Sequence, residues 1–371
     1  ELTGFEMGSF PIRYLGIPLM ASRLNVCHYS PMLNRIGGLI QNWLGKTLSY
    51  ARRLELIHAV VGGIVNFWMA LFPLQVSVID RIDALCRNFL WDRSDSGKKK
   101  SLIAWRIVCS PKEEGGLGLH SLKIWNHAVL VQVLWDISRE KDSLWIRWVH
   151  HFYLRGSSVW SYSPSKSDSP LIKRLFSIRD IICDKAGHME SDHVFHAWLS
   201  AGRFGASQAY SYFRPTRPRV FGSRVVWNAD IPPKEAFILR LAANRRCLTL
   251  DRAPYLGKGS LCPFCNVEQK SNDHLFFKCR TVLRVWADVR DWIHFPRRNI
   301  SLHGIMNSLI HHRAILGNSG RIWCLALATT IYIIWMTRNC MLFDNHSFCF
   351  DDVIGKIKFR IMRLIHLMHL Y

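Results

Sequence analysis

Residues 261–286 read LCPFCNVEQKSNDHLFFKCRTVLRVW, and four of them decide how this part of the chain folds. Two residues separate Cys262 from Cys265, eight separate Cys265 from His274, and four separate His274 from Cys279. A close cysteine pair is typical of a tight knuckle whose sulfurs point at one ion. Three thiolates and one imidazole form a closed tetrahedral set, as in structural zinc sites. Because a closed set leaves no position for water, the pattern predicts a zinc ion that holds structure rather than one that catalyses a reaction.

The residues around these four side chains favour a folded module over a chance cluster. The chain has 11 Cys and 17 His, so some of them must lie close together by chance. However, Pro263 suits a turn in the knuckle, and Asp273 suits the start of a helix. An apolar face at helical spacing follows, formed by Val282, Trp286, Val289 and Ile293. We therefore predict Zn²⁺ as a cofactor, with Cys262, Cys265, His274 and Cys279 as its ligands.

The same region carries a family resemblance over about sixty residues. The matching pieces are Val226-Trp227, Ile231-Pro232-Pro233-Lys234, Leu248-Thr249 with Asp251-Arg252, Cys262-Pro263-Phe264-Cys265, His274-Leu275-Phe276, Cys279 and Val285-Trp286. Together they resemble the zinc-binding domain of plant non-LTR retrotransposon reverse transcriptases. One departure is the looser Lys270-Ser271-Asn272-Asp273, which stands where the family often has an acidic residue before the histidine. The ligands themselves match, so the resemblance implies a zinc-binding domain.

The N-terminal part of the sequence predicts helices. Ser49 is a suitable N-cap for a helix that carries Leu54, Ile57 and Val61 on one face. A second helix is expected from Val78 to Trp91, with Ile79, Ile82, Leu85, Cys86 and Phe89 turned inward. Residues 128–148 are expected to be helical as well. Gly115-Gly116-Leu117-Gly118 lacks the Gly-Lys-Ser/Thr ending of a phosphate loop, so a glycine turn is the favoured interpretation.

This N-terminal part also resembles the thumb and connection that follow the catalytic core in plant LINE-type reverse transcriptases. The resemblance rests on Tyr14-Leu15-Gly16-Ile17-Pro18-Leu19, Trp43 with Lys46 and Leu48-Ser49, Leu56-Ile57, Phe89-Leu90-Trp91, Ala104-Trp105, Cys109-Ser110-Pro111-Lys112 and Glu114-Gly115-Gly116-Leu117-Gly118-Leu119. It implies that a reverse-transcriptase catalytic core lies upstream and is a partner of this chain. Because the sequence begins with Glu1 rather than Met, we expect a fragment.

Composition points to a polyanionic partner. The 371 residues include 49 Lys+Arg against 27 Asp+Glu, which gives a formal net charge of +22. A positive charge of this size most often indicates that the protein binds nucleic acid, here RNA or DNA as template or target. The alternative is a fragment that is simply basic and has no such partner. The 11 cysteines follow no disulfide framework. A nuclear or cytoplasmic, non-secreted protein is therefore expected. The most apolar run, 322–336, is short for a bilayer span, so no membrane partner is expected.

Basic side chains give candidate nucleic-acid contacts, because phosphate contacts need only positive charge. Phe213, directly before the arginine-rich segment 214–224, and Phe221, within it, are candidates to stack on bases. The alternative is an exposed basic linker. The candidate contacts are Lys98, Lys99, Lys100, Arg214, Arg217, Arg219, Arg224, Arg245 and Arg246.

The catalytic chemistry of a polymerase is not apparent in the sequence. A reverse transcriptase needs an aromatic residue, any residue and then two aspartates to hold two metal ions. The one Asp-Asp pair, Asp351-Asp352, has Cys349 at the aromatic position and lies downstream of the zinc-ligand candidates. We therefore expect no catalytic residues in this chain, which is interpreted as a non-enzymatic fragment of an RNA-directed DNA polymerase.

The predicted fold is mainly α. A thumb/connection-like helical region over 1–150 precedes a Ser/Pro- and Arg-rich linker over 151–220, a zinc-binding domain over 221–295 and a helical tail over 296–371. The predicted function is that of a zinc-stabilised, nucleic-acid-binding accessory region of a retrotransposon reverse transcriptase. The alternative is a zinc-stapled protein-interaction module. It would dock through the amphipathic helix whose apolar stripe is Ile354, Ile357, Ile361, Leu364 and Met368.

Overall fold

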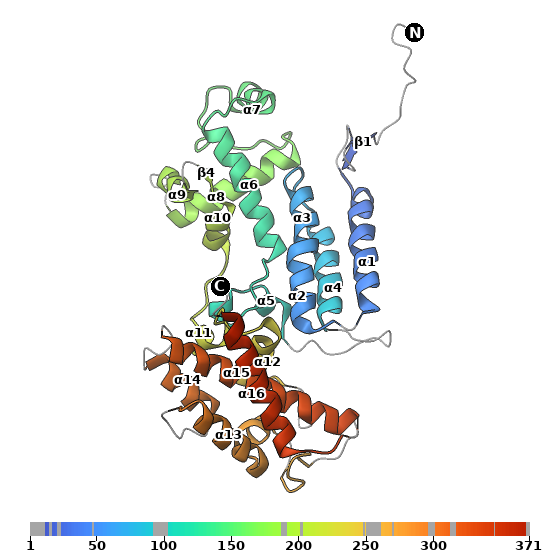
Figure 1. The fold of residues 1–371 in the computed structure, drawn as a ribbon. Helices are drawn as coiled ribbons and strands as arrows, with labels where there is room; N and C mark the ends of the chain where they lie inside the picture. The colour runs from blue at the N-terminus through green and yellow to red at the C-terminus, as the bar shows by residue number, and fades with distance from the viewer. Residues whose placement is uncertain are drawn as a thin grey trace. The chain divides into compact units, whose positions relative to one another are not determined.

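The computed structural model describes residues 12–14, 17–20, 24–46, 48–91, 103–186, 191–200, 203–247, 249, 261–268, 271–295, 301–311, 317–344 and 346–368. Within these ranges the chain is mainly helical, as predicted (Figure 1). The strands in these ranges form two short antiparallel pairs. One joins β1 (Ile12–Tyr14) to β2 (Ile17–Leu19), and the other joins β3 (Leu199–Ser200) to β4 (Arg203–Phe204).

The chain divides into two compact units. Unit 1 comprises Glu1–Leu48, Glu55–Lys99 and Leu119–Arg217, and unit 2 comprises Ser49–Leu54, Lys100–Gly118 and Pro218–Tyr371. The domain boundaries expected at residues 150, 220 and 295 stay predictions.

Unit 1 begins, after the first strand pair, with a set of packed helices. In this set α1 lies beside α3 and α4, and each helix turns its apolar positions inward (Figure 1). On α4 these are Ile79, Ile82, Cys86 and Phe89, as the helical spacing predicted, with Leu85 half-buried. The elements are η1 (Val26–Tyr29), α1 (Ser30–Leu44), the π-helical turn η2 (Ile57–Val61), α3 (Gly62–Met69) and α4 (Val76–Trp91). Helix α2 (Tyr50–Leu56) starts in the segment assigned to unit 2, and Ser49 Oγ accepts a hydrogen bond from Arg52 N at 3.4 Å.

The second part of unit 1 is packed around α6 (Leu122–Ser138). The expected helix over 128–148 is in fact two helices, because Glu140 takes a left-handed conformation and Ser143 caps a new helix by accepting a hydrogen bond from Ile146 N. The segment 151–220, expected as a linker, contains helices that share one apolar core with α6. The remaining elements are α7 (Leu144–Val149), η4 (His150–Leu154), α8 (Pro170–Ala186), α9 (Ser191–Ala197) and α10 (Ala206–Phe213).

Unit 2 is built on α15 (Asn318–Phe343), which lies beside α12 and α16 (Figure 1). By length and composition α15 could cross a membrane, and 61% of its most apolar window is buried within the structure. Burial of this window by neighbouring helices is the packing expected of a helix at the centre of a folded unit. The other elements are α5 (Trp105–Val108), η3 (Lys112–Glu114), α11 (Ser223–Val226), α12 (Pro233–Ala243), η7 (His274–Lys278), α13 (Arg280–Trp292), α14 (Leu302–His311) and α16 (Phe350–Met368).

The apolar stripe of α16 is used inside unit 2. Ile357 and Ile361 have no exposed surface, and Ile354 is buried as well. They pack in one cluster with Val285 and Val289 of α13. The three isoleucines of the stripe on which the alternative interpretation placed partner docking are therefore already covered by the protein itself, while Leu364 is half-buried.

Candidate metal centre

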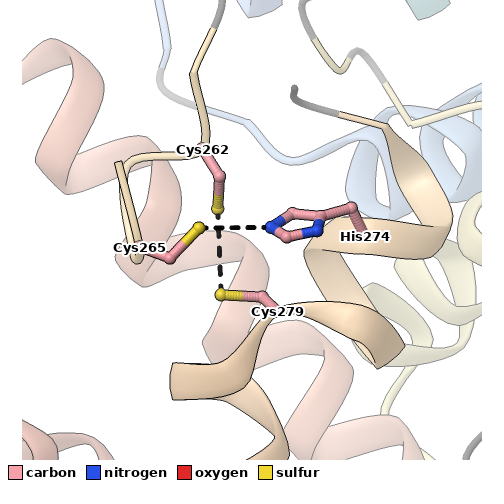
Figure 2. A group of neighbouring side chains, drawn as sticks. All are labelled: Cys262, Cys265, His274 and Cys279. Carbon is pink, nitrogen blue, oxygen red and sulfur yellow. Dashed lines mark hydrogen bonds between the residues drawn. The ribbon is translucent and has the colours of Figure 1, made fainter. Parts of the chain in front are cut away.

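The cysteine knuckle is a tight turn over residues 262–268. Cys262 N donates to Glu268 O at 2.8 Å, and Asn266 N donates to Cys262 O at 2.8 Å. Asn266 takes φ = 52°, a left-handed conformation that asparagine tolerates better than most residues. The turn brings Cys265 to the same side as the buried Cys262, and both sulfurs point into one space (Figure 2).

The other two ligand candidates sit at the two ends of one π-helical turn, η7. Ser271 Oγ accepts a hydrogen bond from His274 N at 3.1 Å where the turn begins. Cys279 N donates to His274 O at 2.8 Å where it ends, and Cys279 is also the N-cap residue of α13. The four-residue spacing seen in the sequence is thus one wide helical turn, which directs both side chains at the knuckle (Figure 2).

The distances between the four ligand atoms fit one tetrahedral zinc ion. Two Zn–S bonds of about 2.3 Å at the tetrahedral angle place two sulfurs about 3.8 Å apart, and a Zn–S with a Zn–N bond places sulfur and nitrogen about 3.6 Å apart. Cys262 Sγ lies 4.0 Å from Cys279 Sγ, and Cys265 Sγ lies 3.4 Å from His274 Nε2. All four atoms lie within 4.8 Å of one another. A zinc ion would therefore be held by Cys262, Cys265, His274 and Cys279. The bound ion would cross-link the knuckle to the start of α13.

The surroundings favour a thiolate at Cys279. A hydrogen bond from Cys262 and the backbone N–H groups of Val282 and Thr281 lower the pKa of Cys279 below that of an ordinary thiol. The same pairing with Cys279, together with burial, raises the pKa of Cys262. Metal ligation requires deprotonated sulfurs, so binding of a metal cation would release the proton that Cys262 and Cys279 share.

Hydrogen bonds tie the module to the rest of unit 2. Thr281 Oγ1 donates to Phe264 O at 3.1 Å and joins α13 to the knuckle, while Asn272 Nδ2 donates to Ala242 O at 3.0 Å and joins η7 to α12. Glu268 Oε2 lies 2.8 Å from His274 Nδ1, the ring nitrogen that faces away from the sulfurs. This is ion-pair distance, but the ring N–H is not aligned for a linear hydrogen bond. A carboxylate beside a ligating histidine is a common outer partner of zinc sites.

Comparison with known proteins adds the family. Residues 204–286 match the family model described as zinc-binding in reverse transcriptase. This segment is similar to zinc-binding domains of the reverse-transcriptase type. The chain is also 33% identical over 179 residues to a putative ribonuclease H protein of Arabidopsis thaliana, a match that covers 47% of this chain and 29% of the relative. An uncharacterized mitochondrial protein of Arabidopsis thaliana is 25% identical over 115 residues, which is 31% of this chain and 75% of that protein.

These comparisons agree with the resemblance to the C-terminal region of a retrotransposon reverse transcriptase. They support the zinc cofactor, because the matched segment contains the whole ligand set. The chain spans 29% of the length of the ribonuclease H relative, so that protein contains much that this chain does not.

The residues predicted to contact nucleic acid differ in their exposure and in their ionic partners. Lys98, Lys99 and Lys100 lie outside the described residues. Arg214 and Arg217 are half-buried, whereas Arg224 and Arg246 are exposed. Arg219 pairs with Glu113 at 3.2 Å, and Arg245 pairs with Asp273 at 3.0 Å. Of the two candidate stacking rings, Phe213 packs against the core of unit 1, while Phe221 is 44% exposed.

Three exposed cations beside the zinc ligands were missed in the sequence. Lys278 and Arg280 flank Cys279 directly, and Arg284 follows one helical turn after Arg280. The sequence contained a signal for two of them, because Val282, Val285 and Val289 mark the buried face of α13 and leave Arg280 and Arg284 on its solvent face.

Proposed function

We propose that this chain is a zinc-stabilised, nucleic-acid-binding accessory region of a LINE-type retrotransposon reverse transcriptase. The single observation that carries the proposal is the set of exposed cations beside the metal ligand Cys279, formed by Lys278, Arg280 and Arg284. In the described part of the chain, Lys278 and Arg280 have no carboxylate within ion-pair distance, so their charge is available to a ligand.

The physical basis is charge neutralisation. Each lysine or arginine that contacts a phosphate releases a condensed counterion, so affinity falls as salt rises. The zinc cross-link fixes the cations on one rigid module, which lowers the entropy lost on binding. In this proposal the ligand is template RNA or target DNA, the catalytic aspartates belong to an upstream reverse-transcriptase core, and the protein acts in the nucleus or cytoplasm.

Salt-dependent binding tests the proposal. The dissociation constant of a fluorescent single strand is measured by anisotropy at several salt concentrations. We expect a strong dependence, and the triple variant Lys278→Ala/Arg280→Ala/Arg284→Ala should reduce the slope of log affinity against log salt by about 2, since each phosphate contact on a single strand contributes about 0.7.

The matched control removes two exposed cations that already have partners. Lys141 pairs with Asp136 at 3.0 Å, and Arg147 pairs with Asp142 at 2.6 Å. Lys141→Ala/Arg147→Ala should leave the slope nearly unchanged. Binding that does not respond to salt, or a control that behaves like the triple variant, contradicts the proposal.

A further inference from the structure

Phe221 and His303 form an exposed pair of stacked rings on unit 2. Their ring centroids are 4.4 Å apart and their planes differ by 16°. Phe221 keeps 44% of its surface exposed, and His303 is exposed as well. Phe221 comes from the turn before α11 and His303 from α14, so the pair exists only in the folded unit.

The turn that presents Phe221 is anchored on one side by Glu113. Val220 N donates a hydrogen bond to Glu113 O at 2.8 Å, and Arg219 Nε lies 3.2 Å from Glu113 Oε2. Two neighbours of Phe221 are thus held by a single residue of η3. The ring therefore projects from a fixed backbone rather than from a freely moving loop.

On the other side the turn is anchored by Gly222. This residue has φ = 76°, a conformation that glycine adopts without steric cost. A Cβ at this position would lie 2.8 Å from Met306 Sδ of α14, so a larger residue would also displace the Met306 side chain. The same contact brings the turn against the helix that carries His303.

The surface around the rings is small and cationic. Val220 is 39% exposed beside Phe221, and two arginines are exposed on the same short segment: Arg224, and Arg219 with its partner Glu113. Two apolar side chains are far too few for a stable protein interface, which buries about 800 Å² on each partner. A flat aromatic face among positive charges matches the chemistry of a nucleobase with its phosphate.

We propose that the exposed face of the Phe221–His303 pair binds an unpaired nucleobase of a single-stranded nucleic acid. This inference rests on the proposed function and adds the strandedness of the ligand. A base in a duplex has both faces covered by its neighbours, whereas an unpaired base can extend the stack. Because stacking displaces few counterions, its contribution to affinity is nearly independent of salt.

The test uses the full chain and three labelled probes in the anisotropy assay: oligouridine, oligothymidine of the same length, and a DNA duplex. Phe221→Ala should weaken both single strands about 5-fold or more, as loss of a base–aromatic stack does. The salt slope and the duplex affinity should not change. Phe221→Trp should retain single-strand affinity, since it keeps an aromatic face.

Phe343→Ala is the matched control, because Phe343 is 50% exposed on the same unit. Ultraviolet cross-linking to oligouridine, with the attached peptide located by mass spectrometry, should mark residues 219–224 or the peptide containing His303. An equal loss for duplex and single strands, or unchanged single-strand affinity in Phe221→Ala, overturns the inference while leaving the proposed function intact. A wild-type chain that binds none of the probes overturns both.

Discussion

Arg360 Nε lies 2.5 Å from Oε1 of Glu235, and Glu235 has no exposed surface. Thr329 Oγ1 donates to the second carboxylate oxygen at 2.7 Å. The three residues belong to α16, α12 and α15, so one buried carboxylate joins the three helices at the centre of unit 2. Burying a charge is costly unless it is paired and hydrogen-bonded, and here both conditions are met.

Removing the cation should therefore destabilise unit 2. Arg360→Met leaves Glu235 buried without its ionic partner, and a broken buried pair costs about 3–5 kcal/mol. We expect a value near 3 kcal/mol in urea unfolding, because a quarter of the Arg360 side chain is exposed and water offsets part of the loss. The double variant Glu235→Gln/Arg360→Met should recover much of this loss, since it leaves no unpaired charge. A double variant less stable than Arg360→Met would contradict this account.

Loss of zinc should unfold the segment from the knuckle to α13. Structural zinc contributes about 10–16 kcal/mol of apparent binding free energy in finger peptides, while whole domains are stable by only about 5–15 kcal/mol. We expect one zinc per chain by mass spectrometry under native conditions, and none in Cys279→Ser. A strong chelator should make residues 261–293 sensitive to protease. Cys349→Ser, which changes an exposed cysteine outside the ligand set, should keep its zinc.

Gly116→Ala should be far more harmful than an alanine at a helical glycine. A Cβ on Gly116 would lie 1.7 Å from Ser110 O and 2.8 Å from Ile107 O, so the turn must open to accept it. We expect the free energy of unfolding to fall by about 3 kcal/mol. At Gly63 in α3 a Cβ would meet nothing within 4 Å. Gly63→Ala should thus be neutral or stabilise by up to about 1 kcal/mol, because alanine favours helix. Thermal melts of the two variants give the comparison.

Acid should weaken unit 1 through His120. The His120 ring lies against the rings of Trp125 and Tyr210, with centroids 4.5 Å and 4.6 Å away. Although the residue keeps exposed surface, desolvation of the ring by these neighbours, with a smaller effect of His58, lowers the pKa of His120. Between the lowered pKa of His120 in the folded chain and its ordinary pKa, the unfolded chain binds a proton that the folded chain does not. The free energy of unfolding therefore rises with pH between these two values and falls as the solution is acidified. The protection factors of the α6 peptides, which correct hydrogen exchange for its intrinsic pH dependence, should fall from pH 7 to pH 5. His120→Phe should show a smaller change, and an unchanged acid response would refute the role of this ring.

Helical spacing and ligand spacing were the parts of the structure that the sequence revealed well. The helix expected from Val78 to Trp91 is observed from Val76 to Trp91, because its apolar positions repeat without interruption. The four zinc-ligand candidates converge as their spacing indicated, since local turns alone bring them together. Both predictions depend on interactions between residues that are near one another in the chain.

What the sequence did not reveal depends on more distant contacts or on competing signals. The Ser- and Pro-rich residues 157–170 led to a linker prediction for 151–220, although Ile172, Leu175 and Phe176 already follow helical spacing and are buried in α8. The stacking of Phe221 on His303 joins two segments whose proximity only the fold creates. No local pattern indicates such a pair.

The order in which the residues of the Glu235–Arg360 pair are synthesised has a consequence for the cell. A ribosome delivers α12 with its carboxylate long before it delivers α16, so unit 2 cannot complete its centre while translation is still in progress. Nascent chains expose Glu235 and the uncovered faces of α13 and α15 during this interval, and such surfaces attract chaperones and proteases. A copy of the gene with a stop codon ahead of Arg360 should therefore yield protein that is degraded rather than accumulated.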